Sequence, residues 1–126
     1  MVYLRIVHKN LGNYSKAEIL LIESLKFYRK YHSKNYRGIA WDLESLGNTY
    51  IISGKYEKAR ELIEESLKIL KEHFLENHVA RTWSLGYLAN ACAGLGDYTK
   101  AKDLLEEVLI IYKKYLSKYY FWDGKN

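Results

Sequence analysis

Along most of this chain, apolar residues recur with an average spacing close to 3.6 residues, and polar residues lie between them. From Tyr56 to Phe74, apolar side chains recur every three or four positions, and Lys, Glu and Arg fill most of the positions between them. This pattern predicts an amphipathic helix of about five turns with one face turned to a core. The same reasoning predicts helices over 14–31, 36–52, 79–95 and 98–116, and a shortened helix over 1–11.

The predicted helices follow a repeat with a fixed period. The motif Gly-x-Tyr-x-x-Ala begins at Gly12, Gly54 and Gly96, at intervals of 42 residues. A period of this length is typical of solenoids of helix pairs, in which each unit buries its apolar face against the next. We therefore predict an all-α solenoid of about three antiparallel helix pairs, with six helices and a truncated first helix. The units are 1–33, 34–75 and 76–118, followed by an aromatic tail at 119–126.

Residues at the expected helix ends agree with this division. Gly54 and Gly96 suit the left-handed backbone of a tight turn between two helices. Asn35 and Asn77 lie where one unit joins the next, and an asparagine can cap the helix that follows it.

Composition supports one folded domain. The chain has 126 residues, of which 48% are hydrophobic, with no proline and one cysteine. No run approaches the roughly 20 consecutive apolar residues of a membrane span, and the first residues lack the apolar stretch of a signal peptide. We therefore expect a cytoplasmic protein with no membrane association. Its net charge of +5 comes from Lys and Arg scattered among acids, which disfavours a nucleic-acid interface.

The second unit resembles the tetratricopeptide repeat. That family combines Leu-Gly-x-x-Tyr in its first helix, Gly-x-Tyr-x-x-Ala at the turn, and then a large apolar and a small residue. The matching residues here are Leu46, Gly47, Tyr50, Gly54, Tyr56, Ala59, Ile63 and Ser66. The third unit departs from the pattern at Ala89 and Cys92, and the first at Arg5 and His8.

The common form of this family repeats every 34 residues, so a period of 42 adds about one helical turn to each helix of the pair. The long form is similar to repeats of kinesin light chains, spindle-orientation adaptors and bacterial receptors for short signalling peptides. The resemblance implies a right-handed solenoid whose first helices line a concave surface. It also implies that this surface binds a peptide or protein segment.

Asparagines are the leading candidates for peptide contacts on that surface. Asn48 and Asn90 occupy equivalent positions, and each amide can donate to a peptide carbonyl and accept from a peptide N–H. The alternative is that each amide bonds to a neighbouring helix. Further candidates on the same helices are Trp41, Trp83, Tyr87, Glu44 and Ile52, although the tryptophans equally suit packing between units.

Glu44 and Gly86 bear on the charge of the ligand. Chaperone-binding members of the family grip a terminal carboxylate with lysine at the positions that Glu44 and Gly86 occupy here. A carboxylate clamp is therefore not expected, and Glu44 would favour a neutral or basic segment.

Catalytic and metal-binding patterns are not found in the sequence. The four histidines form no i, i+4 pair, and Cys92 has no cysteine or histidine near it in sequence. Adjacent acids such as Glu64 and Glu65 point about 100° apart on a helix and cannot act as a catalytic pair. We expect no enzyme activity and no cofactor, and we interpret Cys92 as a small buried residue.

The end of the chain is aromatic where a solenoid usually closes with a polar helix. This composition favours self-association or further repeats, unless the segment from Tyr119 to Trp122 folds back as a cap. The leading function is a peptide-binding scaffold. The alternatives are a structural self-assembly module and, less favoured, an RNA-binding helical repeat. Candidate self-association residues are Tyr115, Tyr119, Tyr120, Phe121 and Trp122.

Overall fold

Five α-helices make up the part of the chain that the computed structural model describes, residues 14–120, with side chains described to residue 115. They are α2 (Tyr14–Tyr31), α3 (Tyr36–Ile52), α4 (Tyr56–His73), α5 (His78–Gly94) and α6 (Tyr98–Tyr120). Their bounds agree with the predicted ranges to within one residue, except that α6 ends four residues later than expected. The predicted first helix, over 1–11, lies outside the described residues.

The helix ends form as the local residue types predict. Asn35 accepts a hydrogen bond from the backbone N–H of Gly38 at 3.0 Å, and Asn77 accepts one from Ala80 at 3.1 Å. These two side chains satisfy N–H groups that the first turns of α3 and α5 leave unpaired. Gly54 and Gly96 adopt φ angles of 79° and 85°, in the left-handed region that favours glycine.

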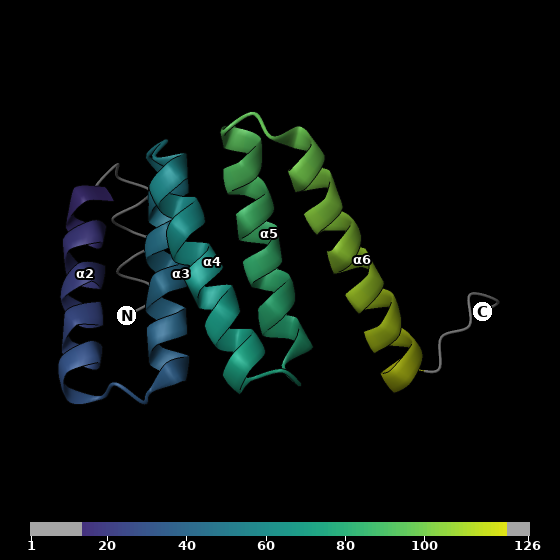
Figure 1. Ribbon diagram of the computed structural model, residues 1–126, viewed down its shortest axis with the longest axis horizontal. Coiled ribbons are helices and arrows are strands. Elements are labelled where there is room, and N and C mark those ends of the chain that lie inside the picture. Colours follow the sequence, from purple (N-terminus) through teal and green to yellow (C-terminus); the bar gives the residue numbers. More distant parts are fainter. Residues whose placement is uncertain (1–13, 121–126) are drawn as a thin grey trace.

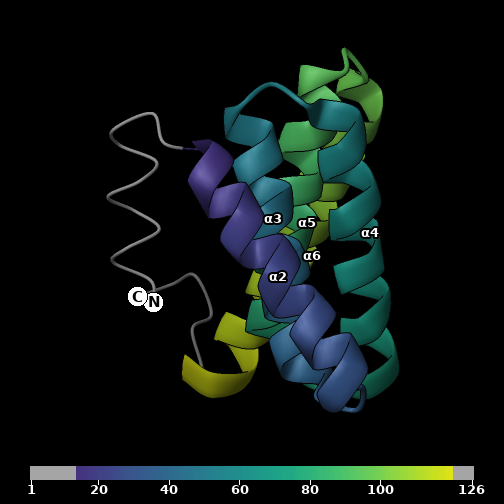
Figure 2. The ribbon, with the colours of Figure 1, turned by 90° about the vertical axis from the view of Figure 1, so that its left-hand side faces the viewer.

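The helices stand side by side in sequence order, each antiparallel to the one before it (Figure 1). Every helix packs against its neighbours in sequence, and α3 also contacts α5. Viewed along the row, α4 lies to one side of α3 and α5 (Figure 2). The described residues thus contain two complete pairs, α3 with α4 and α5 with α6, preceded by α2. This agrees with a tetratricopeptide-like helical repeat, whereas a count of six helices and the right-handed sense stay predictions.

The core lies between these helices and repeats with the units. Leu43, Ile63 and Leu85 are at most 2% exposed. Small residues allow close helix contact: Ala59 is fully buried, and Ser66 donates a hydrogen bond to the carbonyl of Ala40 at 3.1 Å. The long, apolar type of helix that crosses a membrane does not occur among the described helices.

Candidate binding surface

The predicted binding residues lie on one stripe of α3 and one of α5. On α3, Trp41, Glu44, Asn48 and Ile52 follow one another at intervals of three or four residues, which places them on a common helix face. On α5, Trp83, Tyr87 and Asn90 form the equivalent stripe. Because α3 and α5 run in the same direction and are in contact, the two stripes lie side by side. We call this pair of stripes the A-helix surface.

Both tryptophans of the A-helix surface are surface residues. Trp41 is 57% exposed and Trp83 is 59% exposed, although each follows a buried residue in its helix. The Trp83 ring lies 6.2 Å from the ring of Tyr87, so these two aromatic side chains form one patch. Ile52 adds a further apolar side chain that is 43% exposed. Packing between units therefore leaves more than half of the surface of each tryptophan residue accessible.

The asparagines differ in their accessibility. Asn90 is exposed, whereas Asn48 is half-buried. Neither amide hydrogen-bonds another residue of the described part of the chain, so the alternative of a bond to a neighbouring helix is not seen there. Both amides retain donors and an acceptor for a ligand backbone.

Glu44 is the charged residue of the A-helix surface. Its carboxylate is half-buried and accepts a hydrogen bond at 2.7 Å from Ser84 on α5, a side chain that is itself fully buried. Burial raises the pKa of Glu44 above its ordinary value of 4.5, and the bond from Ser84 opposes that rise. Among the described residues Ser84 is the hydrogen-bond donor to this carboxylate, and a cation placed beside it would favour its charged form.

Few of the predicted self-association residues can be described. Tyr115 is half-buried and makes a contact within the protein. Tyr119 and Tyr120 are the last residues of α6, but their side chains, like Phe121 and Trp122, lie outside the described residues.

Sequence reasoning missed an exposed apolar face elsewhere on α6. Tyr98, Leu105, Leu109 and Tyr112 are between 50% and 71% exposed and are spaced to share one side of the helix. Their spacing matches that of the buried face of α4, so the pattern alone predicted burial. We call these four residues the end face.

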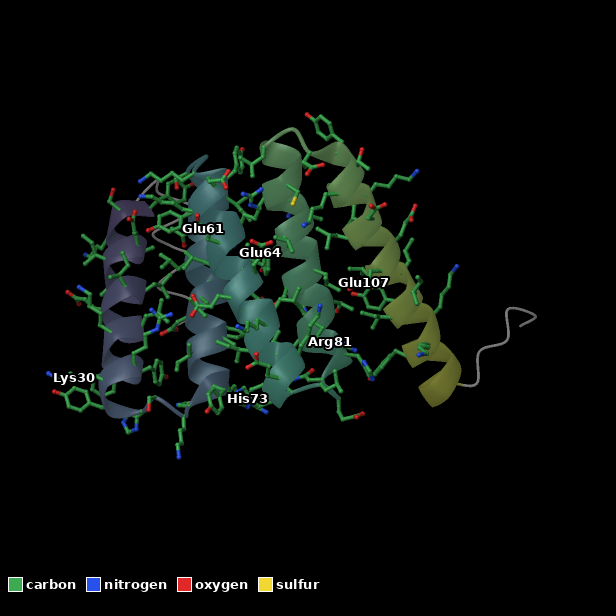
Figure 3. The ribbon with its side chains drawn as sticks, in the orientation of Figure 1. Lys30, Glu61, Glu64, His73, Arg81 and Glu107 are labelled. Atoms are coloured by element: carbon green, nitrogen blue, oxygen red, sulfur yellow. The ribbon has the colours of Figure 1, made fainter. Side chains whose placement is uncertain are left out.

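The other reactive or charged residues considered above lie either in the core or on the solvated surface. Cys92 is 1% exposed, as predicted, and burial raises the pKa of its thiol. Glu61 and Glu64 extend from α4 and Glu107 from α6 (Figure 3), and all three are exposed. No group of three metal-binding side chains occurs in the part of the chain that the structure describes.

A comparison with family models matches the chain to the tetratricopeptide repeat over residues 6–72 and 54–114. The comparison with curated proteins gave no match. The matched ranges overlap and together include all of α2 to α5 and most of α6. They include every residue of the A-helix surface and the end face. The period of 42, the helix pairs and this match agree, and the chain belongs to the tetratricopeptide repeat family.

Proposed function

We propose that this protein is a non-enzymatic interaction module that holds an extended protein segment on its A-helix surface. Tetratricopeptide repeats generally mediate protein–protein interactions. The observation that carries the proposal is the exposure of Trp41 and Trp83, at 57% and 59%, beside two asparagine amides that bond to no described residue. Exposed tryptophans at equivalent positions offer large anchoring areas at low entropic cost.

The two asparagines would hold the ligand backbone. Asn48 and Asn90 are one repeat apart, so their amides can bond two successive stretches of an extended peptide independently of its side chains. The aromatic residues would receive apolar side chains from the ligand between these points.

Glu44 would select the charge of the ligand. Its carboxylate has only the Ser84 hydroxyl as a described hydrogen-bond donor, and a lysine or arginine of the ligand would supply the missing positive charge. A ligand carboxylate would be repelled at the same place. The bound segment is therefore neutral or basic near Glu44.

An immobilised array of twelve-residue peptides, with matched lysine-rich and glutamate-rich members, provides the first test. The best binder is then titrated against the chain by intrinsic tryptophan fluorescence. Replacing Asn48 and Asn90 together by alanine removes about 2 kcal/mol of hydrogen bonding, which is a loss of roughly 30-fold in affinity. Circular dichroism checks that the variant remains folded, and unchanged affinity in a folded variant rejects the asparagine contacts.

Charge selection has a matched control. Glu44→Gln should weaken lysine-rich peptides selectively, whereas Glu61→Gln, at an exposed position on α4, should not. Equal effects of the two substitutions would exclude Glu44 as the selecting group.

A further inference from the structure

Three of the described helices, α2, α4 and α6, repeat the same face, and among these three it is α6 that leaves the face exposed. In α4, Ile63, Leu67 and Leu70 are 0%, 8% and 6% exposed. Their equivalents one period later in α6, which are Leu105, Leu109 and Tyr112, are 50%, 56% and 50% exposed. In α2 the corresponding Leu21 and Leu25 are 6% and 5% exposed.

The difference follows from what lies beyond each helix. The next unit places α3 against α2 and α5 against α4, whereas α6 is the last described helix of the row (Figure 1). Its inner side is packed, because Leu104, Val108 and Ile111 are partly buried against the core. The end face therefore continues an interface that the protein already forms twice.

Two glycines show what these interfaces require of the helix that covers them. A Cβ atom at Gly38 of α3 would lie 2.8 Å from the ring of Tyr28, and one at Gly94 of α5 would lie 2.4 Å from the ring of Tyr56. Each glycine thus lets a helix of the next unit lie directly on a tyrosine.

Both of these tyrosines recur on the end face. Tyr112 is the equivalent of Tyr28 two periods, or 84 residues, later, and Tyr98 is the equivalent of Tyr56 one period, or 42 residues, later. They stand about four turns apart on α6, with Leu105 and Leu109 between them. A helix that covers this face needs a small residue opposite each tyrosine and apolar residues between.

We propose that the end face is a docking site for an amphipathic helix of a partner protein with the residue pattern of α5. α5 has small residues at both positions that this geometry demands, Ala80 and Gly94. The described helices of a second copy offer no such surface. Its α3 and α5 already use the required side against α2 and α4, and α2, α4 and α6 have no two Gly, Ala or Ser residues 14 positions apart, which is the separation of Tyr98 and Tyr112. If the end faces of two copies met, bulky residues would face bulky residues, and no small residue would lie opposite the tyrosines. This site is separate from the A-helix surface.

The probe is a fluorescein-labelled synthetic peptide of residues 77–95 with Cys92→Ala, titrated by anisotropy against the full chain. Leu109→Lys should weaken binding tenfold or more, because it places a charge in the centre of the apolar contact. Ile110→Lys is the matched control: Ile110 is 62% exposed on the same helix but lies outside the end face, and its substitution should change affinity less than twofold. A peptide with Gly94→Leu should also lose binding, since its side chain would meet Tyr98.

Three results would overturn the proposal. The first is that Leu109→Lys leaves the affinity for the peptide unchanged, which would mean that the peptide displaces α5 or binds elsewhere. Another is binding only after residues 121–126 are removed, which would assign the face to the chain's own tail. The third is a dimer in sedimentation equilibrium that Leu109→Lys abolishes and Ile110→Lys does not, which would assign it to a second copy.

Discussion

Two glycine-to-alanine substitutions should change stability in opposite directions, although both lie in helix interiors. Gly47 in α3 faces Ile63: an added Cβ atom would lie 2.6 Å from its Cγ1 atom and 3.0 Å from its Cδ1 atom. Ile63 is fully buried and has little room to move. Gly86 in α5 faces open space, with nothing within 4 Å of an added Cβ atom. The pair separates helix propensity from packing.

The expected magnitudes follow from two opposing effects. Alanine is favoured over glycine in a helix interior by about 1 kcal/mol, and this gain applies at both positions. Overpacking of a close-packed core costs about 1–3 kcal/mol, and this cost applies only at Gly47. Gly86→Ala should therefore raise the free energy of unfolding by about 1 kcal/mol, and Gly47→Ala should lower it by up to about 2 kcal/mol.

Urea unfolding followed by far-ultraviolet circular dichroism measures both changes as shifts in the midpoint at constant slope. A further variant identifies the cause. In an Ile63→Ala background the obstructing side chain is absent, so Gly47→Ala should become stabilising by about 1 kcal/mol. If Gly47→Ala alone raised the free energy of unfolding as much as Gly86→Ala does, the packing argument would be refuted.

Three further predictions concern charge, backbone and thiol chemistry. Because the pKa of Glu44 is raised above 4.5, folding disfavours its charged form and stability falls as pH rises through that raised pKa. Glu44→Gln should thus raise Tm at neutral pH, and this gain in Tm should vanish below pH 4.5. A gain in Tm of the same size at neutral pH and below pH 4.5 would contradict the prediction. Gly96→Ala should cost about 1–2 kcal/mol in urea unfolding, because its φ of 85° strains any residue with a side chain; no loss would contradict it. Cys92 should react with a thiol reagent far more slowly in the native protein than in urea, since it is 1% exposed with a raised pKa; comparable rates would place it at the surface.

Local residue chemistry explains why the helices could be predicted closely from the sequence. Asn35 and Asn77 bond the N–H groups three residues ahead, and Gly54 and Gly96 supply positive φ angles, so each boundary depends on neighbours along the chain. α6 extends beyond its predicted end because the apolar spacing continues into Tyr119 and Tyr120 without a glycine to stop it.

Contacts between units could not be predicted in the same way. The hydrogen bond from Ser84 to Glu44 joins residues 40 positions apart, and it depends on how α5 is placed against α3. The exposure of the end face also could not be predicted from the spacing of apolar residues, because Leu105 and Leu109 repeat the residue types of Ile63 and Leu67. Burial there depends on whether another helix follows, which periodicity within the helix does not encode.

The same dependence accounts for one departure of the third unit from the family pattern. The position of Gly47 in α3 is occupied by Ala89 in α5, and the equivalent of Ile63 one period later is Leu105. Ile63 is fully buried between helices, so any Cβ atom at position 47 meets it. Leu105 is 50% exposed and not branched at Cβ, so it can turn away from Ala89, which is only 2% exposed. Glycine is thus required where the facing residue is fully buried, and alanine is accommodated where the equivalent residue is half exposed.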